Sequence, residues 1–182
     1  MDIAAARRLI APAVPGRGGT WADLGAGHGT FTLALAELLG TGGRVHAVDR
    51  DASAVAALRR LGPTPDTAAI VAHHADFTVT ADLARLDLDA LDGVLLANAL
   101  HFVPAAGQTG ILTDLAGRLR PGGRLVLVEY DDRPASRWVP APVSFDRLGT
   151  LAPRSLSAFA RVGTCRSAYG GAMYAAVAER RP

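Results

Sequence analysis

Short apolar runs recur along the 182-residue chain. Their length and their content of Ala, Val and Leu are typical of strands that are buried on both faces. Five such strands are expected, at residues 20–25, 43–49, 68–76, 91–100 and 124–130. Residues 164–179 predict two more strands about a turn at Gly170 and Gly171.

Between these runs, apolar residues return at the three- to four-residue spacing of a helix. Helices are expected at residues 2–14, 30–40, 51–62 and 105–120. Asp51 is placed to cap the third helix and Gly62 to end it, while Pro121 stops the fourth. The Pro-rich stretch 131–149 is irregular and is expected to lead into a short helix.

Strands that alternate with helices predict an α/β fold with a mostly parallel, doubly wound sheet and helices on both faces. The terminal hairpin adds an antiparallel strand. We expect residues 1–182 to form a single domain, with a helical segment at 1–19, a ligand-binding core at 20–130, and a loop, helix and hairpin at 131–182. Ligands of such sheets bind beyond the carboxyl ends of the strands.

Three glycines stand at alternate positions between the first strand and the helix that follows it, namely Gly25, Gly27 and Gly29. Glycine permits positive φ and lets a ligand approach the backbone closely. The dinucleotide pattern G-x-G-x-x-G requires a third glycine where this chain has Thr30. Asp23 precedes the turn and suits a ligand that carries an amino group rather than a diphosphate.

Acidic residues also end the second and third strands. Asp49 is placed to accept hydrogen bonds from two ribose hydroxyls; its alternative role, a helix N-cap, is better filled by Asp51. Asp76 is placed to accept from an adenine amine, with Phe77 packed against the ring. The alternative for this pair is a turn-forming acid beside a core aromatic.

These blocks resemble a known family. Residues 22–31, 47–51, 73–77, 91–103 and 119–130 are similar, in order and spacing, to the motifs of the class I S-adenosylmethionine-dependent methyltransferases. The resemblance covers residues 20–130, and the terminal hairpin also fits it. It implies S-adenosylmethionine as cofactor and S-adenosylhomocysteine as product.

The resemblance implies a role for each motif. Asp23 and the loop of Gly25, Ala26, Gly27 and Gly29 would border the methionine part and the ribose. Backbone near Asn98 and Ala99 would receive the methionyl amino group.

On the adenosine side, Asp49 would hold the ribose hydroxyls and Arg50 would flank the adenine. Asp76 would contact the adenine amine, and Phe77 would lie against the ring.

Methyl transfer from a sulfonium is a direct displacement, so alignment of donor and acceptor can supply much of the rate. His101, after the fourth strand, is the best candidate for a general base, although a structural histidine beside the cofactor is the favoured alternative. Tyr130 and Asp131 follow the fifth strand and could bind the acceptor or take its proton; a solvated loop is their alternative. Trp138 could line the acceptor pocket, but a hydrophobic anchor is favoured.

The composition excludes several chemistries. All 19 basic residues are arginine, so the chain has neither a lysine Schiff base nor a P-loop lysine. Cys165 is the single cysteine and is expected to be a buried structural thiol. His73 and His74 would point to opposite faces of a strand, so no metal site is expected. The scattered arginines and few aromatics argue against a nucleic-acid partner.

The sequence therefore predicts a cytoplasmic methyltransferase that acts on a small-molecule acceptor, with no membrane span and no signal peptide. One alternative is a non-catalytic S-adenosylmethionine-binding protein. Another is a nicotinamide-dependent oxidoreductase, against which Thr30 and Asp23 argue. Little of the chain is left to form a lid, so an open site would suit a bulky acceptor, a homodimer that covers it, or no catalysis.

Overall fold

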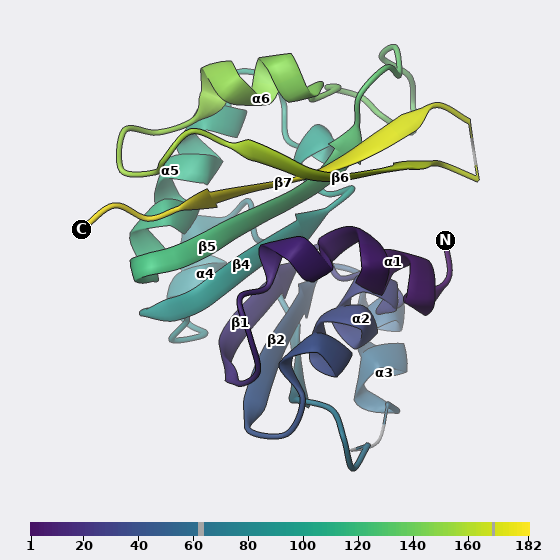
Figure 1. Cartoon of the computed structure of the whole chain (residues 1–182), viewed down its shortest axis with the longest axis vertical. Coiled ribbons are helices and arrows are strands. Elements are labelled where there is room, and N and C mark those ends of the chain that lie inside the picture. Colours follow the sequence, from purple (N-terminus) through teal and green to yellow (C-terminus); the bar gives the residue numbers. More distant parts are fainter. Residues whose placement is uncertain (62–63, 169) are drawn as a thin grey trace.

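One seven-stranded sheet organises the chain (Figure 1). The computed structural model describes residues 1–61, 64–168 and 170–182, and its strand order is β3-β2-β1-β4-β5-β7-β6. Strands β1 to β5 are parallel, and β7 runs antiparallel between β5 and β6. This confirms the predicted sheet and its antiparallel hairpin. The strands are β1 (Gly19–Leu24), β2 (Gly43–Asp49), β3 (Ala69–His74), β4 (Leu91–Ala97), β5 (Leu119–Tyr130), β6 (Ala160–Arg166) and β7 (Ala172–Glu179).

Aspartate side chains cap the helices that begin at residues 3 and 52, and the second of these caps was predicted from the sequence. Asp2 accepts a hydrogen bond from the backbone of Ala5, and Asp51 accepts one from that of Ser53. The predicted helix end at Gly62 lies outside the described residues. Across the described parts of the chain, every helix is too short or too polar to cross a bilayer. The helices are α1 (Ile3–Ile10), α2 (Thr30–Leu39), α3 (Ala52–Arg59), α4 (Thr80–Ala84), α5 (Gln108–Arg118) and α6 (Phe145–Leu151), with 3₁₀ turns η1 (Ala11–Ala13) and η2 (Leu100–Phe102).

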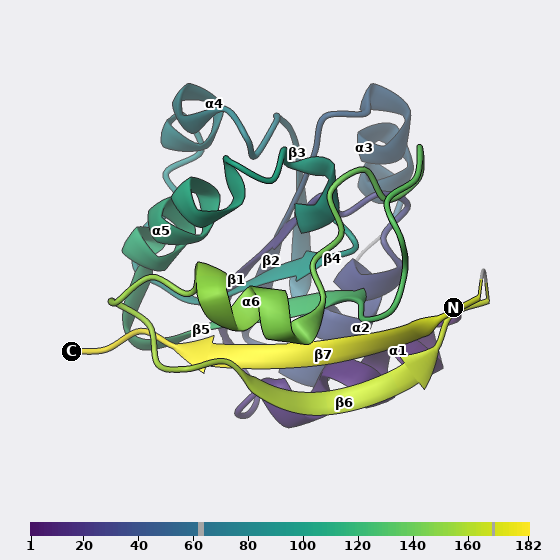
Figure 2. The ribbon, with the colours of Figure 1, turned by 90° about the horizontal axis from the view of Figure 1, so that it is seen from above.

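Side chains that alternate along the strands fill two cores, one on each face of the sheet. On one face, Ala22 and Leu24 of β1 pack in the same cluster as buried leucines of α4, α5 and α6. On the other face, Trp21 packs with buried residues of α1 and α2. Figure 2 shows α5 and α6 close together beside the β5 and β7 strands. The continuous apolar strands are thus explained by burial on both sides.

The structure departs from the sequence prediction around α4, α5 and the hairpin. The helix expected at 105–120 is shorter, because Leu119 is extended and pairs with Leu91 at the start of β5. Pro121 cannot continue a helix, and the Gly122 N–H donates to the Arg180 carbonyl instead. The short α4 was not predicted, and β6 begins at Ala160 rather than at 164.

The strand order reverses between β1 and β4. From β1 the chain proceeds outward to β2 and β3, and then crosses to β4 on the other side. Loops after β1 and β4 therefore diverge at the carboxyl edge of the sheet and leave a crevice there. The glycine turn and the segment from Asn98 onward both lie at this point.

Candidate active site

The glycine turn joins β1 to α2, and its three glycines have different reasons to be there. All three have positive φ, at 75° for Gly25, 52° for Gly27 and 89° for Gly29. A Cβ on Gly25 would lie 2.7 Å from the Cβ of Ala99, and one on Gly29 would lie 2.7 Å from Leu58. A Cβ on Gly27 would meet no atom within 4 Å. Packing within the protein therefore requires two of the glycines, and Gly27 alone faces open space.

Asp49 holds this turn in place. Its Oδ2 accepts a hydrogen bond from the Gly27 N–H at 2.7 Å, and its Oδ1 accepts from the Asp51 N–H at 2.8 Å. The N–H groups of Gly25 and Ala26 both donate to the Val48 carbonyl. The end of β2 thus fixes the loop that follows β1.

Asp23 lies beneath the turn in β1 and is only 1% exposed. Its Oδ2 accepts a hydrogen bond from the Thr32 hydroxyl at 2.6 Å, while its Oδ1 is buried with no hydrogen-bond partner among the described residues. Burial raises the pKa of Asp23 to about 7; the Thr32 hydrogen bond opposes this rise and the nearby Asp49 charge adds to it. Asp23 therefore supports the turn from below and does not line the cavities described next.

Three cavities adjoin at the crevice. The first, named the Asp49 cavity, has a volume of about 460 Å³. Arg50 and Asp76 form an ion pair on its wall, at 3.6 Å. Burial acts to raise the pKa of Asp76, but hydrogen bonds from Thr78 and the Arg50 charge outweigh it and hold this pKa below its usual value. Its lining comprises Gly25, Gly27, Asp49, Arg50, Asp76, Phe77, Thr78, Asn98, Ala99, Phe102 and Pro104.

The second, named the hairpin cavity, has a volume of about 510 Å³. It lies on the other side of the glycine turn and is walled by Met1 and Asp2, by Tyr130, and by Cys165 and Met173 of the terminal hairpin. Cys165 is partly rather than fully buried, so the expected buried thiol is only partly confirmed. No local pattern predicts that the first residues and the terminal hairpin meet here.

The third, named the Trp138 cavity, has a volume of about 760 Å³ and lies on the β5 side. Trp138 is 66% exposed and Phe102 is 50% exposed. The favoured interpretation of Trp138 as a hydrophobic anchor is therefore wrong, because the ring lies on the cavity wall instead of in a core. The lining consists of Asn98, His101, Phe102, Tyr130, Arg133 and Trp138.

Asn98 lines all three cavities. It has a φ of 54°, a conformation that few residues other than glycine, asparagine and aspartate adopt. Its N–H donates to the Val128 carbonyl, and its side-chain Oδ1 is buried with no partner in the described parts of the chain. A residue with a left-handed backbone and an unsatisfied buried oxygen thus stands where the cavities meet.

Next to Asn98 lies a buried pair, His101 and Glu129, of which the sequence analysis identified only His101. The His101 Nδ1 is 2.6 Å from Oε2 of Glu129, and the His101 N–H donates to Oε1 of the same carboxylate at 3.2 Å. The two side chains are 2% and 0% exposed. Glu129 was missed, although a charged residue inside the apolar run of β5 is itself a signal.

The structure separates Tyr130 from Asp131. The Tyr130 ring lines the hairpin and Trp138 cavities and carries the Arg133 guanidinium 4.7 Å from its centre. Asp131 binds Arg161 at 2.7 Å with one oxygen and accepts from the Phe145 N–H at 2.9 Å with the other. Asp131 thus holds the start of α6 against the hairpin, and its catalytic role stays a prediction.

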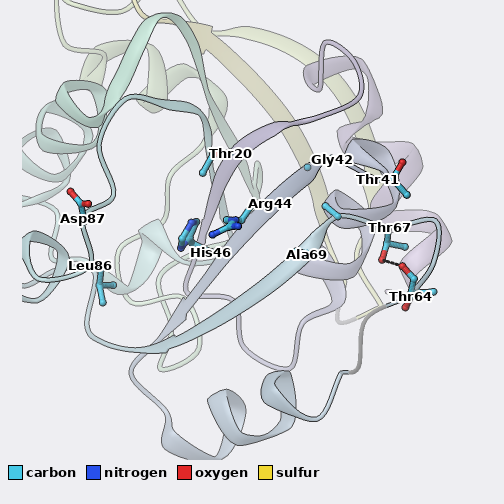
Figure 3. Close-up of a pocket in the computed structure, with 12 residues that line it drawn as sticks. Thr20, Thr41, Gly42, Arg44, His46, Thr64, Thr67, Ala69, Leu86 and Asp87 are labelled. Atoms are coloured by element: carbon cyan, nitrogen blue, oxygen red, sulfur yellow. Dashed lines mark hydrogen bonds between the residues drawn. The ribbon is translucent and has the colours of Figure 1, made fainter.

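A fourth cavity, of about 890 Å³, lies at the opposite end of the sheet, where β2 and β3 begin (Figure 3). Arg44 and His46 point into it. The Nδ1 of His46 is 2.9 Å from the Nε2 of His73, whereas His74 faces the Arg50 carbonyl. His73 and His74 thus have separate partners, and the described residues contain no group of three or more His, Cys, Asp or Glu side chains that could hold a metal.

The sheet is doubly wound, and its glycine turn and acidic strand ends border adjoining cavities at the switch point. This arrangement is typical of the nucleotide-binding class of α/β proteins. A family model described as "Methyltransferase domain" matches residues 22–123. This is more than half of the chain, and the chain belongs to that family. Together with the fold, this match identifies it as a domain of the class I S-adenosylmethionine-dependent methyltransferase family.

Solved structures share the whole fold. The N-methyltransferase NodS from Bradyrhizobium japonicum WM9 matches with a TM-score of 0.72 and 18% identity, over 99% of this chain and 94% of that one. The 1,6-didemethyltoxoflavin-N1-methyltransferase of Burkholderia thailandensis, solved with 1,6-didemethyltoxoflavin and S-adenosylhomocysteine, matches with a TM-score of 0.70 and 22% identity, over 98% and 79%. At these identities the likeness shows the fold alone.

A curated relative matches over a shorter stretch. The ribosomal RNA small subunit methyltransferase H of Chromobacterium violaceum is 35% identical over 78 residues. That stretch is 43% of this chain and 24% of the relative. The chain therefore spans about a quarter of the curated relative it matches.

Proposed function

We propose that this methyltransferase transfers the methyl group of S-adenosylmethionine to a small-molecule acceptor by direct displacement. The observation that carries the proposal is that three cavities adjoin at Asn98. Such a site needs one compartment for each half of the donor and one for the acceptor. Bound there, S-adenosylmethionine supplies a methyl group already activated by its sulfonium.

The residues present fit the donor. The Asp49 cavity offers carboxylates at two strand ends for ribose hydroxyls and the adenine amine, with Phe77 for the ring. Arg50, paired with Asp76, flanks the same space. The open side of Gly27 leaves room for a ligand against the backbone. These contacts support the assignment of this cavity to the adenosine half.

The hairpin cavity suits the methionine half. It begins at Gly25 and Ala26 of the glycine turn and ends at Asn98. The buried Oδ1 of Asn98 lacks a partner, and a ligand amino group would supply one. Gly29 and Ala99 shape this region through packing, since they lie against Leu58 and Gly25.

The Trp138 cavity is left for the acceptor. Its volume lies within the range of 300–1,000 Å³ that is usual for small-ligand pockets. The toxoflavin-type neighbour acts on a small molecule according to its name, which supports a small acceptor here. A cytoplasmic location, the absence of a nucleic-acid partner and a homodimer that covers the site stay predictions.

Calorimetric titration with S-adenosylmethionine, S-adenosylhomocysteine and NADH tests this function. We expect both sulfur ligands to bind, NADH not to bind, and Asp49→Ala to weaken binding at least tenfold through loss of the carboxylate. Asp66→Ala, at an exposed position in the turn before β3, is the matched control and should bind as the wild type does. If neither sulfur ligand binds the wild type, the proposal is wrong.

A further inference from the structure

The buried pair of His101 and Glu129 has the geometry of a base held by a carboxylate. The Glu129 carboxylate contacts the ring Nδ1 of His101 at 2.6 Å and accepts a hydrogen bond from the His101 backbone N–H at 3.2 Å. Because Nδ1 is engaged with Glu129, Nε2 is the ring nitrogen that remains for a ligand. His101 lines the Trp138 cavity, which is the compartment proposed above for the acceptor.

A purely structural role explains this pair poorly. A carboxylate that is 0% exposed is costly to bury, and an apolar pair of similar size would usually stabilise the fold as well or better. Buried ionisable pairs at the wall of a cavity are instead typical of functional sites. A carboxylate in this position fixes the imidazole tautomer and stabilises the imidazolium that forms when the ring takes a proton.

The cavity walls indicate which proton is taken. Three aromatic rings line the cavity, those of Phe102, Tyr130 and Trp138. Trp138 is 66% exposed and Phe102 is 50% exposed, which is unusual for such large apolar side chains. The Arg133 and Arg137 guanidinium groups lie 4.7 Å and 4.5 Å from the ring centres of Tyr130 and Trp138. None of the described residues that line the cavity is acidic. Flat rings beside positive charge suit an aromatic compound that becomes anionic.

Resting on the methyl transfer proposed above, we propose that the acceptor is an aromatic hydroxyl compound and that His101 is its general base, positioned by Glu129. The O–H proton passes to Nε2 of His101. The oxygen lone pair forms the bond to the methyl carbon, and the carbon–sulfur electron pair stays with sulfur, which leaves a neutral thioether. The imidazolium then releases its proton to water, so an aryl methyl ether and one proton are the net products.

A coloured nitrophenol makes the proton transfer visible without turnover. The protein is saturated with S-adenosylhomocysteine, which carries no transferable methyl group, and the phenolate absorbance of the nitrophenol is followed as it binds. The wild type should raise the phenolate fraction at a pH where the free compound is mostly protonated. His101→Asn keeps an amide that can donate to Glu129 but removes Nε2, and it should abolish the rise. Glu129→Gln should reduce it.

Turnover with S-adenosylmethionine then separates a base from a structural residue. On a simple, weakly acidic phenol, His101→Asn should lose about 10²–10⁴-fold in kcat, which is the usual contribution of a general base. On the nitrophenol, assayed at a pH above the pKa of its hydroxyl, the loss in kcat should be less than about tenfold, because the acceptor is already ionised. His46→Gln removes an imidazole at the other end of the sheet and is the control, with no change expected on either acceptor.

The outcomes distinguish this inference from the proposed function. If S-adenosylhomocysteine binds the wild type but no phenol is bound or methylated, the aromatic acceptor is wrong and methyl transfer stands. If His101→Asn binds S-adenosylhomocysteine normally and loses equal activity on both phenols, the base role is wrong. If S-adenosylhomocysteine fails to bind the wild type, the proposed function fails and this inference with it.

Discussion

The buried carboxyl of Asp23 makes the stability of the ligand-free protein depend on pH in an unusual direction. Burial raises the pKa of Asp23 from 3.8 to about 7, so the folded protein keeps a proton that the unfolded chain releases. In any pH range where the folded state binds more protons than the unfolded state, the free energy of unfolding falls as the pH rises. This contribution is therefore fully present below pH 4, declines through pH 4–7, and is lost above about pH 7.

Asp23→Asn measures the effect, because the amide cannot ionise and its oxygen can still accept from Thr32. A pKa rise from 3.8 to about 7 corresponds to about 4 kcal/mol at a differential energy of 1.36 kcal/mol per pKa unit. We expect Asp23→Asn to be more stable than the wild type by about 4 kcal/mol at pH 8, and by less than about 2 kcal/mol at pH 5.

Urea unfolding of both proteins at pH 5 and pH 8, without ligand, gives the two differences. Comparison at equal pH cancels the titration of all groups distant from residue 23. Asp66→Asn, on the exposed turn before β3, should match the wild type at both pH values. A stability difference between Asp23→Asn and the wild type that is the same at pH 5 and pH 8 would refute the reasoning.

Three further predictions use single substitutions. Gly93→Ala places a Cβ 2.3 Å from the Trp21 ring and should destabilise by about 1–3 kcal/mol, whereas Gly110→Ala in α5, with no atom within 4 Å, should stabilise by about 0.5–1 kcal/mol; urea unfolding compares them. Gly27→Ala should cost about 1–2 kcal/mol of stability because its φ is positive, and calorimetry should show at least tenfold weaker S-adenosylhomocysteine binding. Trp138→Ala should raise the KM for an aromatic acceptor about tenfold or more with S-adenosylhomocysteine affinity unchanged; a parallel loss of that affinity would contradict the separation of the two cavities.

The parts of the fold that could be predicted from the sequence are those that depend on patterns of neighbouring residues. The parallel strands follow from apolar runs, and the glycine turn from alternate glycines between a strand and a helix. The acids at residues 49 and 76 could be placed because parallel strands bring their carboxyl ends to one edge. Each of these inferences needs only neighbouring residues and the rule that a doubly wound sheet binds at the switch point.

The parts that it missed depend on distant segments. Glu129 and His101 are 28 positions apart, and no pattern of neighbouring residues indicates that their side chains are in contact. The hairpin cavity joins Met1 to Met173, across almost the whole chain. The sequence slightly favours Trp138 as an anchor of the loop, and only the tertiary structure shows its ring on a cavity wall.

Polar groups that are costly to bury gather at the carboxyl ends of the central strands. Asp23 of β1, Asn98 after β4 and Glu129 of β5 lie at the carboxyl ends of three adjacent strands, and the first two leave an oxygen without a hydrogen-bond partner among the described residues. Such groups lower the stability of a protein unless a partner satisfies them. Of the three, Asn98 lines the cavities itself and Glu129 contacts His101 on the wall of the Trp138 cavity, whereas Asp23 lies beneath the glycine turn. The donor and the acceptor would then complete the core of this methyltransferase at the switch point.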